Sequence, residues 1–530
     1  MLNTPRSTRG MIVAPHHLAA EAGLHVLREG GNAIEAMIAA LATIAVVYPH
    51  MNGLGGDNCW LVRTAGGALT GIDACGRAWQ EADPAIYRVC GMDAIPARGP
   101  LAAITVAGAV SGWKAAAELA RQAGGRMPLE RLFEDAIYHA RHGFPASRSQ
   151  HDNTLAKRGE LEDVPGFAAS YLPGDGGVPG IGELFRQPAL AVTLERMAEV
   201  GLDDFYRGEL ARAIAADLEA AGSPIRAPDL AAQRALRGMP LSLRAFGATV
   251  YNLPPPTQGL AALMILGLFE RLGCREANGF DFVHGLVEAT KRAFRVRDAH
   301  VTDPAYMDAS PEEFLEPAYL DSTAAEIDRA RALLWNGEAA AGDTVWLGAI
   351  DNAGHAVSCI QSLYWEFGSG VVLPATGITW QNRGASFELN HGARNPLMPG
   401  RKPFHTIQPP LALLDDGRVM VYGTMGGDGQ PQTQAAIFTR YAAFGQELQQ
   451  AVTAPRWLLG RTWGEHKMSL RIEDRFSPHV ITSLAHAGHN VETVGAFNEV
   501  MGHAGAIVRH RSGVFEGAAD PRGDGLVATF

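Results

Sequence analysis

The residues that could do chemistry in this 530-residue chain do not fall into the common catalytic motifs. No serine lies in a GxSxG elbow and no HExxH pair occurs, so a serine hydrolase or zinc peptidase lacks its usual sequence support. The glycine-rich run 53–57 follows an expected helix and has no Lys-Ser/Thr after it, which favours a tight turn over a phosphate-binding loop. The five cysteines are widely spaced and the eighteen histidines are scattered, so we expect no metal and no cofactor.

The most informative polar and glycine residues lie in three segments, 342–347, 366–372 and 423–432. Taken alone, Thr344 is an ordinary β-branched residue that begins an apolar strand after the Gly/Ala-rich stretch 337–342. The three segments become informative when they are considered together with other sequence blocks that occur in a fixed order along the chain.

These further blocks cover both ends and the middle of the sequence. They are GMIVA (10–14), EGGNA (29–33), GLGGD (53–57), PPPTQG (254–259), EATK (288–291), RD (297–298), DP (303–304), PGRKP (399–403) and GAADPR (517–522). Together with the three segments, they resemble the γ-glutamyltransferase family of N-terminal nucleophile hydrolases over nearly the whole chain.

The resemblance implies a proenzyme that cuts itself between Asp343 and Thr344. The cut would make Thr344 an N-terminal residue, so that its hydroxyl is the nucleophile and its α-amino group, with a reference pKa of about 8, is the adjacent base. The family's oxyanion-binding backbone amides fall on Gly426 and Gly427, and its supporting hydroxyl residue falls on Ser362. The implied chemistry is nucleophilic attack on an amide.

The sequence departs from the family pattern where a glutamyl substrate would bind. Glutamyl-transferring members hold the α-amino group with an acidic residue that falls on Ser386 and with polar residues that fall on Tyr364 and Arg383. None of these three suits an ammonium group. The arginine that holds the α-carboxylate falls on Cys75, with Arg77 two residues later as a candidate replacement. The residues that would bind a glutamyl group are therefore largely missing.

The remaining polar groups favour a small anionic amide. Two positions that are usually serines in transferases fall on His405 and Thr406, which keep hydrogen-bonding capacity. Arg383, together with Arg77, could hold a carboxylate bidentately, and Tyr364 would shrink the pocket. Within the family, this pattern is most similar to members that hydrolyse oxamate to oxalate and ammonia in purine and ureide breakdown. The plain alternatives are a surface arginine at 383 and a core aromatic at 364.

Three other functions remain open at this point. One is a γ-glutamyltransferase or glutathione hydrolase with an unusual amino-group site, and a second is an acylase for dicarboxyl amides such as the cephalosporin side chain. A third, from another class, is an uncleaved relative that serves as a binding or structural protein.

Composition and charge limit the partners. The formal net charge is −11 and no basic block is present, so we expect no nucleic-acid partner. The longest largely apolar run, 36–48, is too short to span a bilayer, and the N-terminus lacks an export signal. The unpaired cysteine pattern is typical of reduced proteins. We therefore expect a cytoplasmic protein with no membrane partner.

The periodicity of apolar residues predicts the elements that must position these groups. Expected helices cover 19–29, 33–47, 110–122, 129–142, 189–200, 209–221, 259–272, 282–299 and 311–334. Expected hairpins turn at 351–354, 415–417 and 511–513.

Helices early in the chain and hairpins late in it predict antiparallel sheets between helical layers. With the resemblance, the expected fold is α+β, a four-layer αββα sandwich of the N-terminal nucleophile hydrolase type. One precursor would give a mostly helical α chain, 1–343, that contributes strands, and a catalytic β chain, 344–530. The two chains would form one structural unit, an α/β heterodimer that could dimerise further.

Overall fold

A computed structural model describes residues 3–174, 176–335, 342–460 and 469–530. The part of the Gly/Ala-rich stretch at 337–341 lies outside the described residues. Within the described ranges, none of the helices has the length and apolar character needed to cross a bilayer.

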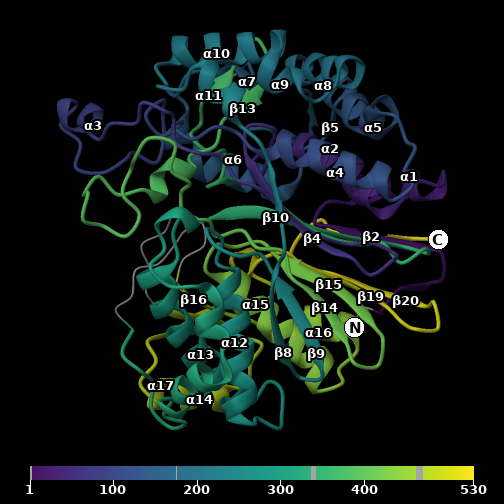
Figure 1. Cartoon of the computed structure of the whole chain (residues 1–530), viewed down its shortest axis with the longest axis vertical. Coiled ribbons are helices and arrows are strands. Elements are labelled where there is room, and N and C mark those ends of the chain that lie inside the picture. The colour runs from purple at the N-terminus through teal and green to yellow at the C-terminus, as the bar shows by residue number, and fades with distance from the viewer. Residues whose placement is uncertain (1–2, 175, 336–341, 461–468) are drawn as a thin grey trace.

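Two seven-stranded sheets form the centre of the molecule, and every neighbouring pair of strands in them is antiparallel (Figure 1). The first sheet has the order β1 (Arg6–Ser7), β20 (Phe515–Ala519), β19 (Ala504–Arg509), β15 (Val419–Thr424), β14 (Leu411–Leu414), β9 (Ala248–Asn252) and β8 (Leu241–Ala245). The second has the order β21 (Leu526–Thr529), β2 (Gly10–Ala14), β10 (Asp343–Asp351), β11 (Ala356–Tyr364), β3 (Asp57–Arg63), β4 (Leu69–Ala74) and β7 (Leu236–Gly238).

Helices cover the outer face of each sheet (Figure 1). Those over the second sheet include α1 (His17–Arg28), α2 (Ala33–Val47) and α4 (Ala109–Gln122), with α5 (Leu129–His142), α8 (Pro188–Val200) and α10 (Glu209–Ala221) beyond them. Those over the first sheet include α12 (Gly259–Leu272), α15 (Gly429–Phe438) and α16 (Leu448–Thr453), with α13 (Phe280–His300) packed against α12 and α15. Three apolar cores separate the four layers. The expected αββα sandwich is confirmed.

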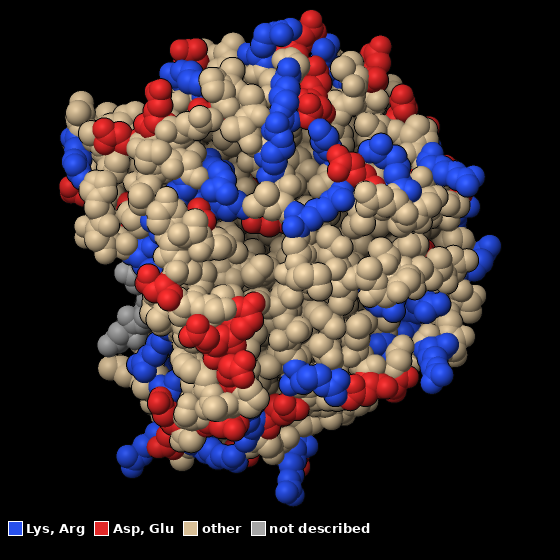
Figure 2. All heavy atoms as spheres, viewed as in Figure 1, with Lys and Arg blue, Asp and Glu red and all other residues tan. Residues whose placement is uncertain are grey.

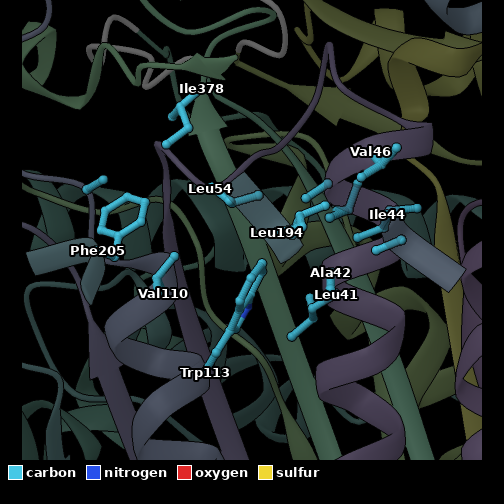
Figure 3. Packing of buried hydrophobic residues seen from close by; sticks show 14 of the residues in the cluster. Leu41, Ala42, Ile44, Val46, Leu54, Val110, Trp113, Leu194, Phe205 and Ile378 are labelled. Carbon is cyan, nitrogen blue, oxygen red and sulfur yellow. The ribbon is translucent and has the colours of Figure 1, made fainter. Parts of the chain in front are cut away.

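Helix α2 shows how the sequence builds the apolar core between the second sheet and its helices. Asn32 caps the helix by accepting hydrogen bonds from the backbone N–H groups of Ile34 and Glu35, both at 3.0 Å. Every residue of α2 is buried, in agreement with its apolar character on all sides. Figure 3 shows Leu41 of α2 beside Trp113 of α4 in this core.

Trp346 of β10 fills the space between the two sheets. Its indole Nε1 donates a hydrogen bond to Ser358 Oγ at 2.9 Å. A Cβ added to Gly423 or Gly505 on the facing strands would lie 2.2 Å from Cδ1 or 2.6 Å from Cζ3 of this ring. The two glycines therefore make room for the indole of Trp346, which comes two residues after Thr344 in the chain.

The expected elements are largely present. The helices expected before residue 300 all occur with ends shifted by a few residues, and the three expected hairpins are β10/β11, β14/β15 and β19/β20. The strands β2, β3, β4, β8 and β9 were not placed by the sequence analysis.

The prediction of one helix over 311–334 is wrong. This segment forms a short 3₁₀ helix, Pro311–Leu315, and a helix α14 (Pro317–Ala325), followed by irregular chain to residue 335. Pro317 cannot continue a preceding helix because it lacks an N–H donor. Farther on, the N–H groups of Ala332 and Leu333 donate to Ala487 O (2.7 Å) and Glu288 Oε2 (3.1 Å), so partners elsewhere in the fold replace helical ones.

We predict that Gly505→Ala lowers the stability of the protein because the new methyl group meets the Trp346 ring. Overpacking of a core typically costs about 1–3 kcal/mol. Gly238→Ala in β7 is the matched control, since an added Cβ there has no atom within 4 Å. Thermal unfolding measures both variants, and equal melting temperatures would contradict the proposed fit between the sheets.

Candidate active site

Thr344 lies at the start of β10, where the ladder to β11 is irregular. Asp343 is paired with Tyr364 and Val345 with Gln361, so the register shifts: Ser362 and Leu363 form a β-bulge in β11, and Thr344 is the single residue opposite it. Thr344 is 1% exposed, and its hydroxyl donates a hydrogen bond to the backbone carbonyl of Gln361 at 2.8 Å. The bulge thus places a buried hydroxyl directly after the peptide bond that the sequence analysis expects to be cut.

The backbone just before this bond runs between several candidate residues. A Cβ added to Gly342 would lie 2.8 Å from Thr406 Oγ1 and 3.5 Å from both Gly427 Cα and Tyr364 Cδ2. The structure therefore brings Tyr364, Thr406 and Gly427 to the segment that leads into Thr344.

Gly426 and Gly427 form the turn between β15 and α15. Both have positive φ angles, 112° and 44°, which glycine adopts without strain. Among the described residues, none accepts a hydrogen bond from the N–H of Gly427. The turn also lies at the N-terminus of α15, where the helix dipole favours negative charge. A developing oxyanion would be stabilised by such groups.

Arg383 is a buried cation with no paired carboxylate. Its side chain is fully buried, and within the described parts of the chain no Asp or Glu oxygen lies within 4.0 Å of its guanidinium nitrogens. Nη1 donates to Thr406 Oγ1 at 3.3 Å, Nη2 lies 3.5 Å from Ser362 Oγ, and the guanidinium stacks 4.0 Å from the centre of the Tyr364 ring. Burial lowers the pKa of Arg383, but an arginine stays protonated at neutral pH.

Tyr364 has a backbone conformation that is rare for a bulky residue. Its φ angle is 83°, and its N–H donates a hydrogen bond to Ser362 Oγ at 2.8 Å. Strained residues of this kind cluster at functional sites. Here the conformation turns the ring toward Arg383 at the end of β11.

His405 forms a buried pair with Asp57. Its Nε2 lies 3.0 Å from Asp57 Oδ2, while Asp57 Oδ1 accepts hydrogen bonds from the backbone N–H groups of Gly76 (2.9 Å) and Gly108 (3.0 Å). Burial, followed by the charge of Arg383, lowers the pKa of His405 to about 4. His405 is therefore neutral at physiological pH and donates its Nε2 proton to Asp57.

The glycine run before Asp57 is a tight turn, as the sequence analysis expected. The N–H of Gly56 donates to Gly53 O at 3.2 Å, and β3 begins at Asp57. A Cβ on Gly56 would lie 2.1 Å from the carbonyl oxygen of Ser362, so only glycine allows this close approach.

The structure does not bring Arg77 to the Arg383 cluster. The Arg77 side chain is 47% exposed, and its Nη1 lies 3.0 Å from Gly400 O and 3.5 Å from Asp303 Oδ2. Because β4 ends before Cys75, the two-residue alternation of a strand does not carry Arg77 to the side where Cys75 lies. Cys75 is buried, with its Sγ 3.8 Å from Cys59 Sγ.

Ser386, at the position of the family's amino-group carboxylate, uses its hydroxyl locally. Its Oγ donates to the backbone carbonyls of Arg383 at 2.9 Å and Phe404 at 3.3 Å. The hydroxyl thus supplies no negative charge beside the guanidinium.

Two groups of potential metal ligands occur among the described residues, and both are already engaged. The first comprises Cys59, Asp73 and Cys75, and the second His284, Glu288 and His489. In the first group, Asp73 accepts a hydrogen bond from the buried Lys402. In the second, Glu288 accepts one from the buried Lys291, and His284 Nδ1 lies 2.9 Å from His489 Nε2. These contacts satisfy the ligand atoms, so neither group indicates a metal centre.

Some residues that shape the site were missed by the sequence analysis. Asp57, Gln258 and Asp428 lie in segments that were noted, yet no role was assigned to them. All three side chains are fully buried. A polar residue next to glycines is a sequence signal for a buried polar side chain of this kind, but the signal does not identify the residue to which that side chain hydrogen-bonds.

Comparisons with known proteins agree with this geometry. The family model described as Gamma-glutamyltranspeptidase matches residues 19–530. The chain is 54% identical over 525 residues to the oxamate amidohydrolase proenzyme of Klebsiella pneumoniae, covering 99% of both chains. It is 41% identical to the glutathione hydrolase-like YwrD proenzyme of Bacillus subtilis, covering 98% of both.

A solved structure gives the same result for the fold. The crystal structure of cephalosporin acylase from Bacillus halodurans matches with a TM-score of 0.92 and 33% identity, over 100% of this chain and 97% of that one. The relatives from Klebsiella pneumoniae and Bacillus subtilis are named as proenzymes, and proenzymes of this family are cleaved into two subunits that remain together. The chain belongs to the γ-glutamyltranspeptidase family of N-terminal nucleophile hydrolases, which are enzymes that act on amides.

Proposed function

We propose that this protein is a self-cleaving threonine amidohydrolase that acts on a small carboxylated amide, with oxamate as the preferred substrate. The observation that carries the proposal is the buried guanidinium of Arg383, which has no carboxylate partner among the residues described. A buried cation without a counter-ion is costly, and an anionic substrate supplies that counter-ion.

The first step in this proposal is cleavage of the chain before Thr344. The Thr344 hydroxyl attacks the carbonyl carbon of Asp343, the C–N bond breaks, and the acyl group is left as an ester on Thr344. Water hydrolyses the ester and gives a new carboxyl group on Asp343 and a free α-amino group on Thr344. The products are an α chain, 1–343, and a β chain, 344–530, that stay together as a heterodimer.

The second step is hydrolysis of the substrate by the new N-terminus. The α-amino group accepts the hydroxyl proton as Thr344 Oγ1 attacks the amide carbon, and the oxyanion is held by the N–H groups of Gly426 and Gly427. The α-ammonium group gives this proton to the amide nitrogen, the C–N bond breaks, ammonia leaves, and an oxalyl ester remains on Thr344. Water attacks this ester, releases oxalate and restores the hydroxyl.

Arg383 would bind the carboxylate of the substrate through its planar guanidinium, backed by the Tyr364 ring. Ser362 and Thr406 orient the guanidinium. His405, whose pKa burial and the charge of Arg383 lower, is neutral and adds no charge. The overall charge of −11 does not attract an anion. Acidic and basic side chains are interspersed over much of the face in Figure 2, so a local arginine must provide the attraction.

The relative at 54% identity, named an oxamate amidohydrolase proenzyme, supports this substrate. Ser386 also disfavours a glutamyl substrate, because its hydroxyl gives no ion pair to an α-ammonium group. Glutathione hydrolysis and acylase activity are the alternatives that the substrate assay below distinguishes.

We predict that purified wild-type protein gives two bands on a denaturing gel, and that Thr344→Ala gives one full-length band. The alanine variant has no nucleophile for the acyl shift. Thr344→Ser is the matched control because it keeps a hydroxyl, so it should still be cut. N-terminal sequencing of the smaller band should begin at residue 344. A cut Thr344→Ala chain would contradict the proposed nucleophile.

We predict that the cleaved enzyme releases ammonia from oxamate faster than it releases p-nitroaniline from γ-glutamyl-p-nitroanilide at equal concentration. The physical reason is that the substrate-binding group is a cation without a neighbouring carboxylate. Faster turnover of the glutamyl compound would reject oxamate as the preferred substrate.

We predict that Arg383→Ala raises the KM for oxamate about 10- to 100-fold, the loss expected for a hydrogen bond to a charged group worth about 1.5–3 kcal/mol. Arg383→Lys should give an intermediate KM because it keeps the charge and loses the planar fork. Arg77→Ala provides the comparison, since its guanidinium already contacts Asp303. An equal rise in KM for Arg77→Ala would contradict the assignment of the carboxylate to Arg383, and a rise for Arg77→Ala alone would assign it to Arg77.

A further inference from the structure

Gln258 connects two parts of the candidate active site through one side-chain amide. Its Nε2 donates one hydrogen bond to the carbonyl oxygen of Thr406 at 2.6 Å and another to that of Gly427 at 2.8 Å. Gln258 precedes α12 and is fully buried. Both protons of the amide are therefore used on backbone carbonyls, one beside Arg383 and one in the glycine turn.

Arg297 of α13 fixes the orientation of this amide. Its Nη1 lies 3.0 Å from Gln258 Oε1 and 2.7 Å from Asp428 Oδ1, while its Nε donates to Asp298 Oδ1 at 2.7 Å. Rotation of the Gln258 amide by 180° would direct its oxygen at two carbonyl oxygens and its NH₂ group at a guanidinium. The network consequently allows one orientation.

Each peptide unit of the glycine turn is held by its carbonyl oxygen. The Thr424 hydroxyl donates to Met425 O at 3.0 Å, and the N–H of Gly429 donates to Gly426 O at 2.6 Å. The third unit, which joins Gly427 to Asp428, accepts from Gln258 Nε2 at 2.8 Å and, at the longer distance of 3.3 Å, from the N–H of Gln430. The N–H of Gly427 lies in the planar unit of the Gly426 carbonyl, whereas the Gly427 carbonyl shares its plane with the N–H of Asp428. The two planes meet at Gly427 Cα, so holding both of them limits rotation about the φ and ψ angles of Gly427 and keeps its N–H aimed in one direction.

Gln258 is distinct from the other anchors. Thr424, Gly429 and Gln430 belong to the chain that forms the turn, whereas Gln258 comes from a segment about 170 residues earlier. Asp428, next to Gly427, accepts from the same Arg297 that orients Gln258. The side-chain network thus attaches the turn to α12 and α13 at two successive residues.

We infer that Gln258, oriented by Arg297, is a positioning residue that holds the oxyanion-binding glycine turn at Gly427 and couples it to the segment that carries Thr406. This inference rests on the proposed function, since it assigns the turn to oxyanion stabilisation. Gln258 touches neither the nucleophile nor the expected substrate position, and it acts through backbone groups.

The test uses two variants of the full chain, Gln258→Met and Gln258→Glu. Methionine keeps the length of the side chain and removes both hydrogen bonds, whereas a carboxylate keeps the contact with Arg297 but offers no N–H donors. We expect kcat per mole of cleaved enzyme to fall on the order of 10- to 100-fold in both variants, with KM within about threefold of wild type. Melting temperatures are measured in parallel.

Gln408→Met is the matched control. Gln408 is another fully buried glutamine, two residues after Thr406, whose Nε2 bonds to Gln434 Oε1 rather than to the turn. A comparable fall in melting temperature with kcat near wild type is expected for this variant. Equal loss of kcat in Gln408→Met and Gln258→Met would overturn the inference, because general loosening of the core would then explain both.

Three other outcomes are also decisive. Values of kcat within threefold of wild type in both Gln258 variants would overturn the inference, and so would failure of both to fold. Folded Gln258 variants that remain uncut beside a cut Gln408→Met would support it, because Gly427 lies against Gly342 just before the scissile bond.

The assay separates this inference from the proposed function. It uses whichever amide the wild-type enzyme hydrolyses, so a wrong substrate does not affect it. Full activity of Thr344→Ala would reject the proposed function, whereas normal kcat in the Gln258 variants of an active, Thr344-dependent enzyme would reject only the role of Gln258.

Discussion

Antiparallel pairing of β10 with β11 is the constraint on which the rest of the site depends. The pairing places Asp343 opposite Tyr364 and Val345 opposite Gln361, so residues 16 to 21 positions apart meet at one end of the ladder. Between the two pairs, Thr344 lies opposite a bulge of β11. Trp346 then fixes the strand against the opposite sheet, where two glycines receive its ring.

The same pairing explains why a cut before Thr344 is compatible with one structural unit. The N-terminal part of the precursor supplies β2, β3, β4 and β7 to the second sheet, while the C-terminal part supplies β10, β11 and β21. Strand β10 lies between β2 and β11, so its neighbours come from both parts. Backbone hydrogen bonds and the apolar cores therefore continue across the two chains of the proposed heterodimer.

Electrostatics at the site follow from burial. The guanidinium of Arg383 has lost its water shell and is compensated by the π face of Tyr364 and by hydroxyl groups rather than by a carboxylate. The nearby Asp57 is engaged by His405 and by two backbone N–H groups, so its charge is directed elsewhere. Such an arrangement leaves the guanidinium without a carboxylate close by among the described residues, as the proposed binding of an anionic substrate requires.

Most helices and the three late hairpins follow from the amino-acid sequence alone, because apolar periodicity and turn residues are local signals. The family and the four-layer fold follow from the resemblance of its ordered motifs. Ordered motifs also indicated Thr344 and the glycine turn. The early strands, the end of the expected helix 311–334, and the separation of Arg77 from Arg383 were decided by tertiary structure. The same holds for the link from Gln258 to Gly427. These features depend on which distant backbone groups and charges meet when the layers pack, and such contacts leave no periodic trace in the chain.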